Sequence, residues 1–84
     1  MSDRDNLTIL LFGSIREAIG SSQIEVQNMS GKTVLELRNH LAHTYPCAPD
    51  IKTCLVATNQ KYSTEDTILH SSNEIALIPP VNGG

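Results

Sequence analysis

The sequence has 84 residues, 39% of them hydrophobic, and six basic against nine acidic side chains give a net charge of -3. This length fits one domain with one core, in which about 60% of the unfolded surface can be buried. The negative charge argues against nucleic acid, whose binding depends on neutralising phosphates. No apolar run is longer than the four residues of 9–12, which is far too short to cross a membrane.

The polar N-terminus, residues 1–6, lacks the apolar core of a secretory signal, so we expect a cytoplasmic protein. Cys47 and Cys54 are too few for a zinc site, and a reducing compartment argues against a disulfide between them. His40 and His43 are three residues apart, but no Cys or carboxylate completes a metal site with them. We therefore expect no metal centre, and we interpret the cysteines as structural or incidental.

Two strands and a short helix are expected in the first third of the chain. Residues 7–12 are almost entirely apolar, which is typical of a strand buried on both faces of a sheet. Ser14 and Glu17 have the spacing of a capping box, so a helix of little more than one turn is expected up to Gly20. Residues 23–27 alternate between polar and apolar side chains, which predicts a half-buried strand near an edge.

The main helix is expected to begin after Thr33. Thr33 and Glu36 have capping-box spacing, and Pro46 marks the end of the helix. Apolar residues recur between these limits at helical intervals and predict one face that packs on the core, formed by Val34, Leu37, Leu41 and Tyr45.

The second half of the chain predicts a loop and two further strands, with a short return between them. Residues 47–53 read as a loop, and residues 54–58 read as a strand that turns back through Tyr62. Residues 74–78 form the last strand, which is apolar on both faces like the first, so we expect these two strands to be neighbours in the middle of the sheet. The order strand, strand, helix, strand, strand predicts an α+β fold of the β-grasp type, with one main helix packed across a mixed sheet.

The last residues of the sequence read IPPVNGG. Pro79 and Pro80 fix φ near roughly -65° and lack amide donors, which predicts an extended segment that leaves the sheet. We therefore divide the chain into a flexible N-terminus (1–6), a β-grasp domain (7–78) and a tail (79–84). The tail can reach roughly 20 Å, enough to enter the active site of a partner.

The tail has the features of a reactive group. Gly83 and Gly84 lack Cβ atoms, so they can pass a narrow channel and leave the terminal carbonyl open to attack, while Val81 and Asn82 supply side-chain contacts on the way. A terminal carboxylate is a poor electrophile and would need activation, most simply as an acyl-adenylate formed with ATP. The alternative is an ordinary disordered end.

Four segments, LFGSIREAIG, TVLELRNHLA, VATNQ and NEIALIPPVNGG, together resemble one known family, the sulfur-carrier small subunits of molybdopterin synthase. The resemblance runs from about Leu7 to Gly84. Its most specific part is the diglycine preceded by two prolines and an apolar residue.

This resemblance implies a ubiquitin-like β-grasp fold and a reactive Gly84. A ubiquitin-activating-like enzyme would adenylate Gly84 with ATP, and a sulfurtransferase would supply the sulfur of a thiocarboxylate. The tail would then enter the large catalytic subunit, typically in a heterotetramer, and give its sulfur to cyclic pyranopterin monophosphate. The acid, base and substrate-binding residues would belong to the large subunit, so the chain would not catalyse the reaction alone and would hold no permanent cofactor.

The two strands nearest the tail supply the candidate docking residues, Phe12 and Ile78. Two other functions remain open. One is a sulfur carrier for thiazole synthesis or tRNA thiolation, or a ubiquitin-like modifier joined to lysines. The other is a β-grasp interaction module whose tail is inert.

Overall fold

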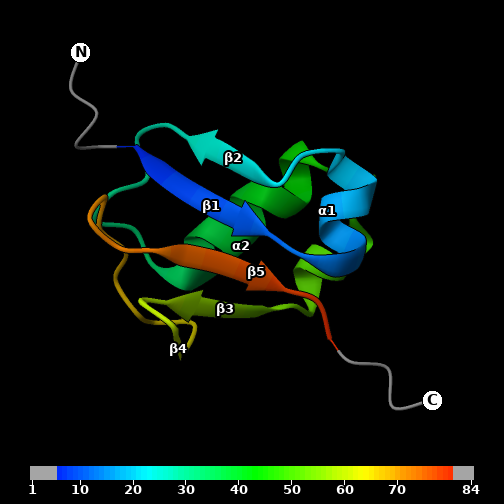
Figure 1. The fold of residues 1–84 in the computed structure, drawn as a ribbon. Coiled ribbons are helices and arrows are strands. Elements are labelled where there is room, and N and C mark those ends of the chain that lie inside the picture. Colours follow the sequence, from blue (N-terminus) through cyan, green and yellow to red (C-terminus); the bar gives the residue numbers. More distant parts are fainter. Residues whose placement is uncertain (1–5, 81–84) are drawn as a thin grey trace.

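The structure is a computed structural model in which residues 6–80 are described. Five strands form one sheet in the order β2-β1-β5-β3-β4, and the long helix α2 crosses one of its faces (Figure 1). The elements in chain order are β1 (Leu7–Leu11), α1 (Gly13–Ile19), β2 (Gln23–Val26), α2 (Val34–Thr44), the 3-10 helix η2 (Pro49–Lys52), β3 (Leu55–Thr58), β4 (Lys61–Tyr62) and β5 (Ile75–Ile78).

The first and last strands are neighbours at the centre of the sheet, as predicted. β1 pairs with β5 in parallel, with Ile9 opposite Ile75 and Leu11 opposite Leu77. The other pairs, β1 with β2, β3 with β5 and β3 with β4, are antiparallel. The sheet is therefore mixed, and the predicted edge position of β2 is confirmed.

The core lies between the sheet and α2. Each central strand sends alternate side chains into it, because successive residues of a strand point to opposite faces. The α2 residues predicted to face the core, Val34, Leu37 and Leu41, are buried, and Tyr45 is half-buried against them. The strand residues that meet them are Leu7, Ile9 and Leu11 from β1, Val56 from β3, and Ile75 and Leu77 from β5.

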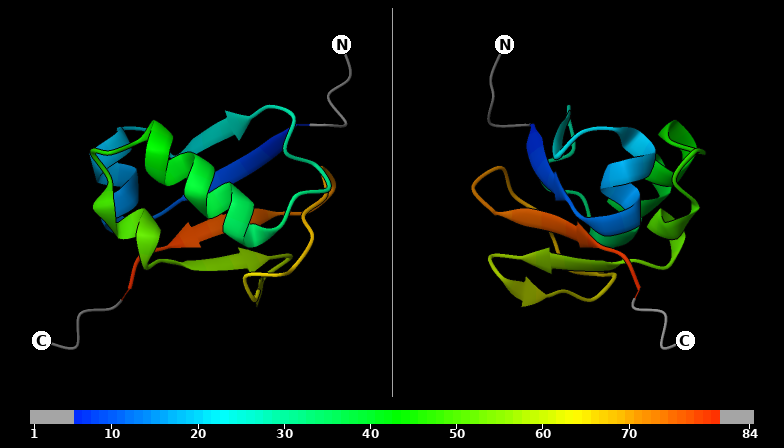
Figure 2. Two further views of the ribbon diagram at one scale, coloured as in Figure 1. Left: turned by 180° about the vertical axis from the view of Figure 1, so that it is seen from behind. Right: turned by 45° about the vertical axis from the view of Figure 1, so that its right-hand side comes forward.

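The other face of the sheet is open, so the prediction that both central strands are buried on both faces is wrong. Thr8 is exposed, and Leu10, Ala76 and Ile78 are only half-buried. Figure 2 shows the physical reason, since α1, α2 and η2 all lie on the same side of the sheet. An apolar run in a strand therefore does not by itself require that both faces are covered.

The start of α1 also differs from the prediction. Gly13 is the first helical residue and Phe12 is its N-cap, without a side-chain capping hydrogen bond. Ser14 thus lies inside the first turn, where its hydroxyl contacts the Asp50 carboxylate of η2, and the predicted capping box with Glu17 does not form. The helix has seven residues, about two turns, and ends at Gly20 as expected.

The predicted capping box at the start of α2 is confirmed. The Glu36 amide donates to the Thr33 hydroxyl at 3.1 Å, and the Thr33 amide donates to the Glu36 carboxylate at 2.9 Å. The Thr33 amide and then the Thr33 hydroxyl, which also donates to the Glu36 carboxylate, hold the pKa of Glu36 below its usual value. The next free amides of the helix, Val34 and Leu35, donate to the backbone oxygens of Thr67 and Glu65 at 2.9 Å.

The connection after α2 holds more structure than predicted, because Pro49–Lys52 forms η2 inside the expected loop 47–53. The predicted turn at Asn59 and Gln60 is present, and both residues have positive φ, 52° and 69°, as a tight hairpin turn between right-twisted strands requires. Asn59 also bonds Glu74 through both its backbone amide and its side-chain oxygen, so this turn is fastened to the start of β5.

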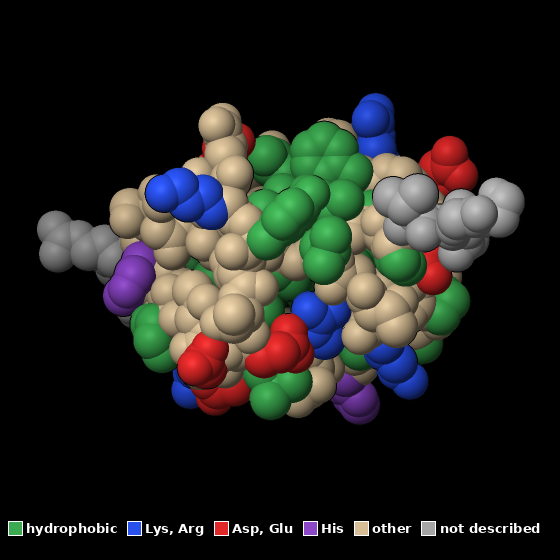
Figure 3. Space-filling model, turned by 90° about the horizontal axis from the view of Figure 1, so that it is seen from below, with side chains coloured by type: hydrophobic (Ala, Val, Ile, Leu, Met, Phe, Trp, Pro, Cys, Tyr) green, Lys and Arg blue, Asp and Glu red, His purple; other side chains and the backbone are tan. Residues whose placement is uncertain are grey.

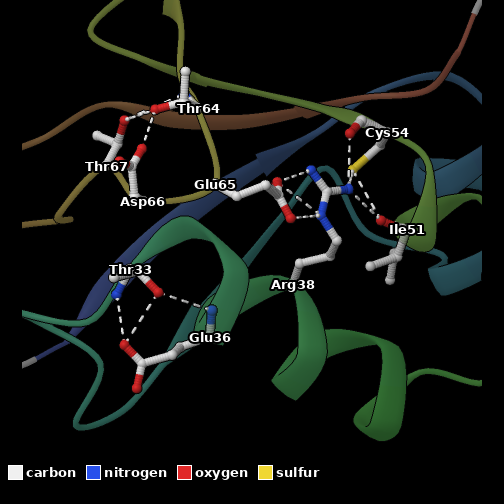
Figure 4. A network of polar contacts seen from close by, with 9 residues as sticks. All are labelled: Thr33, Glu36, Arg38, Ile51, Cys54, Thr64, Glu65, Asp66 and Thr67. Carbon is white, nitrogen blue, oxygen red and sulfur yellow. Dashed lines mark hydrogen bonds and ion pairs between the residues drawn. The ribbon is translucent and has the colours of Figure 1, made fainter.

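A network around Arg38 joins α2 to two distant segments (Figure 4). The Arg38 Nη1 group donates to the backbone oxygens of Ile51 and Cys54, each at 2.8 Å, where η2 leads into β3. Nη2 donates to the Glu65 carboxylate at 2.8 Å, on the segment that covers the start of α2. Arg38 therefore fixes both segments to one helix.

The same network determines the ionisation of its members. Burial alone lowers the pKa of Arg38, but Glu65 and Cys54 together outweigh burial and raise that pKa above its usual value. Burial raises the pKa of the Cys54 thiol, which donates to the Ile51 oxygen at 3.3 Å. Cys54 thus stays protonated as part of the core, whereas Cys47 is exposed.

Thr33→Ala should destabilise the protein by about 1 kcal/mol, because the Glu36 amide loses its capping acceptor. Chemical denaturation measures this loss. Asn39→Ala, at an exposed position of the same helix, is the control and should change stability by no more than about 0.5 kcal/mol. Equal stability of the two variants would show that the capping box contributes nothing.

Arg38→Met should cost about 2 kcal/mol, because two backbone oxygens lose their donor. Glu65→Gln should cost less than about 1 kcal/mol, since the Glu65 side chain is 49% exposed and water can replace the lost charge. Urea unfolding of both variants tests this order. A larger loss for Glu65→Gln would mean that the ion pair, and not the two oxygens, is the main contribution of Arg38.

Candidate partner-docking site

The open face of the sheet carries a shallow apolar hollow of about 330 Å³. Figure 3 shows the molecule from the β3 and β4 side, where hydrophobic side chains gather in a surface cluster. We call the hollow the sheet hollow. It is lined by Leu10, Phe12, Ala57, Gln60, Tyr62, Glu74, Ala76 and Ile78.

The pairing of the strands explains the shape of the sheet hollow. Ala76 of β5 lies opposite Leu10 of β1 and opposite Ala57 of β3, so two small side chains occupy the middle of the face. Larger side chains stand around them, with Phe12 at the end of β1 and Tyr62 on β4. The larger side chains around the two alanines therefore leave a depression above them.

The chemistry of the sheet hollow suits the binding of an apolar surface. Phe12 is 46% exposed and Tyr62 is 71% exposed, which is unusual for side chains of this size. Gln60 and Glu74 supply polar groups at the rim. An exposed apolar patch with a polar rim is typical of protein interfaces.

The structure brings together the two predicted docking residues. Phe12 follows Leu11 and Ile78 follows Leu77, and Leu11 and Leu77 are opposite each other in the parallel pair. Both predicted residues line the sheet hollow. The prediction missed Leu10 and Ala76, although the apolar second face of both central strands was the signal that could have identified them.

The predicted tail begins at the border of the sheet hollow. Ile78 lines the hollow, and the next residue, Pro79, is half-buried while Pro80 is exposed. The remaining tail residues of the prediction, Val81, Asn82, Gly83 and Gly84, lie outside the described residues, as does the N-terminus up to residue 5. The proposed division into N-terminus, domain and tail stays a prediction.

The described domain offers binding groups more than reactive ones. His40, His43 and His70 are all exposed. In residues 6–80, no group of three or more His, Cys, Asp or Glu side chains could hold a metal ion. None of the helices in that range is long and apolar enough to cross a membrane. Within residues 6–80, the sheet hollow is the candidate functional surface.

Residues 9–84 match the ThiS family, so the chain belongs to that family. Among curated proteins, it is 38% identical over 80 residues to the molybdopterin synthase sulfur carrier subunit of Dictyostelium discoideum, covering 90% of this chain and 93% of that protein. It is 32% identical over 79 residues to the subunit of the same name from Arabidopsis thaliana, covering 93% of this chain and 82% of that protein.

Solved structures confirm the predicted β-grasp fold. SAMP1 from Haloferax volcanii has a TM-score of 0.75 and 22% identity, with 94% of this chain and 99% of that chain covered. A complex of subunits 1 and 2 of the molybdopterin-converting factor from Helicobacter pylori contains a chain with a TM-score of 0.65 and 24% identity, again with 94% and 99% covered.

Proposed function

We propose that this protein is the sulfur-carrier subunit of a molybdopterin synthase and that Gly84 carries the sulfur as a thiocarboxylate. The observation that supports this function most is the near full-length similarity to curated sulfur carrier subunits from several organisms. The family match extends to Gly84 and so includes the whole predicted tail.

The proposed chemistry takes place at one carboxyl group. The Gly84 carboxylate attacks the α-phosphate of ATP on a ubiquitin-activating-like enzyme, which releases pyrophosphate and leaves an acyl-adenylate. A sulfur donor at the oxidation level of sulfide, delivered by a sulfurtransferase, then displaces AMP. ATP is thus a substrate of the activating enzyme, and this chain holds no permanent cofactor.

Transfer of the sulfur needs a second protein. In the large subunit the thiocarboxylate sulfur bonds to a carbon of cyclic pyranopterin monophosphate as an oxygen substituent leaves that carbon. Water then cleaves the acyl–sulfur bond, which restores the Gly84 carboxylate and leaves the sulfur on the pterin. Two charged carriers serve one dithiolene, which suits a heterotetramer. The acid and base residues belong to the large subunit, so this chain alone is not an enzyme. We propose the cytoplasm as the compartment, because the cycle consumes ATP.

We propose that the sheet hollow docks on the large subunit and that the tail continues from it into the active site. Three observations support this occupant. The hollow is apolar with a polar rim, Ile78 connects it directly to Pro79, and the Helicobacter pylori neighbour was solved as a complex of two subunits. Docking by the domain then brings the tail to the partner at a defined place.

Deletion of Gly84 should abolish molybdopterin formation in a reaction with the large subunit, the activating enzyme, ATP and a sulfur donor. Addition of two alanines after Gly84 should have the same effect, because no free carboxylate remains at that glycine. Both variants should still bind the large subunit through the sheet hollow. Product formation by either variant would contradict the proposed function.

Phe12→Ala should weaken binding to the large subunit at least about tenfold, because a buried aromatic anchor contributes on the order of 2 kcal/mol. Leu35→Ala is a matched control, since Leu35 is also 46% exposed but lies on α2, away from the sheet hollow. Titration calorimetry measures both affinities. Equal losses for the two variants would exclude the sheet hollow as the docking surface.

A further inference from the structure

The end of β1 and the start of the tail lie side by side. In the parallel pair, Leu11 is opposite Leu77, and Figure 1 shows that both strands end on the same side of the molecule. Continuing this register by two residues brings Gly13 next to Pro79. The pairing of the central strands therefore places the first residue of α1 against the first residue of the tail.

The contact between Gly13 and Pro79 depends on the absence of a side chain. A Cβ atom built on Gly13 would lie 3.0 Å from Cγ of Pro79 and 3.5 Å from its Cδ. The shorter distance is below an ordinary van der Waals contact, so a side chain at position 13 would have to displace the proline ring. Gly13 also has φ of 55°, in the left-handed region that favours glycine.

This contact has a specific consequence for the tail. Pro79 has no backbone N–H, so it cannot extend the hydrogen-bond ladder of β5 through its own amide. The direction in which the chain leaves β5 then depends on how the proline ring packs. The residue before Gly13 is Phe12, which lines the sheet hollow, so one junction connects the docking surface to the direction of the tail.

We propose that Gly13 is a positioning residue for the reactive end of the chain: the packing of Pro79 on Gly13 aims the tail relative to the sheet hollow. The proposal rests on the proposed function, because it concerns the delivery of Gly84 to a partner active site. Gly13 itself touches no reacting atom. Its role is to leave the space that the ring of Pro79 fills.

A side chain at position 13 should lower the rates of the reactions at Gly84, adenylation and sulfur transfer, when the partner is saturating. It should leave the affinity for the large subunit nearly unchanged. Gly13→Ala should have a small effect, because the proline ring needs to move by only a few tenths of an ångström. Gly13→Val should lower kcat between about tenfold and about a hundredfold, since misplacement of a reacting group by about 1 Å has effects of that size.

Gly20 provides the matched control. Its φ is 83°, so Gly20→Ala and Gly20→Val introduce the same kind of backbone strain as the Gly13 variants. A Cβ at Gly20 meets no atom within 4 Å, so these variants do not disturb the tail. They should therefore keep the kcat of the wild-type protein. A similar loss of kcat at both glycines would overturn the proposal, because strain alone would then explain it.

A double-mutant cycle tests whether Gly13 acts through Pro79. Pro79→Ala removes the ring atoms nearest to Gly13 and should itself lower kcat. If the two residues act through their contact, the Gly13→Val/Pro79→Ala variant should be little worse than the poorer single variant. If the loss of kcat in the double variant equals the product of the two single losses, the two residues do not act through a shared mechanism. If Gly13→Val does not fold, Pro79→Ala alone carries the test, and an unchanged kcat in that variant would contradict the proposal.

Two readouts separate this proposal from the proposed function. Thiocarboxylate formation by the unmodified protein, followed by mass, tests the proposed function. Nuclear Overhauser contacts between the Gly13 Hα atoms and the Pro79 ring protons in the isolated protein test the packing without any partner. We expect strong contacts, lost in Gly13→Val and kept in Gly20→Val. Their absence from the unmodified protein would overturn the positioning role even if sulfur transfer occurs.

Discussion

The parallel pairing of β1 with β5 is the contact on which the arrangement of the molecule depends. It joins the first strand to the last and puts both at the centre of the sheet, with Leu11 opposite Leu77. Parallel strands cannot be joined by a tight hairpin, so α2 lies in the long connection between them and covers one face. The same pairing brings Phe12 beside Ile78 and places Pro79, the first residue of the tail, beside Gly13, the first residue of α1.

The described helices cover only one of the two sheet faces, and the other face carries the proposed docking surface. In the described residues α1, α2 and η2 cover one face, so the apolar second face of the central strands stays open. Small side chains at Ala57 and Ala76 deepen this face into a hollow. The core thus lies on one side of the sheet and the proposed docking surface on the other. The tail, proposed to carry the chemistry, continues from β5, which contributes side chains to both.

The sequence was enough to predict the order of the elements, because apolar periodicity, the Thr33 capping box and the turn at Asn59 are local signals. Three features could not be predicted. An apolar run such as residues 7–12 does not reveal whether its second face meets the same chain or another protein. Ser14 matched a capping pattern, but the bond from the Arg16 amide to the Phe12 oxygen starts the helix one residue earlier, and the Ser14 hydroxyl bonds Asp50 of η2 instead. The bonds of Arg38 to Ile51 and Glu65 join segments far apart in sequence, which no local pattern encodes.

The central claim is that Gly84 carries the transferred sulfur atom as a thiocarboxylate. The most direct measurement is the intact mass after incubation with ATP, the activating enzyme and a sulfur donor. The account predicts a gain equal to the exchange of one oxygen for sulfur, with the change assigned to Gly84 by fragmentation. An unchanged mass, with an activating enzyme that charges a known carrier in parallel, would contradict the account and leave the sheet hollow as the surface of a binding module.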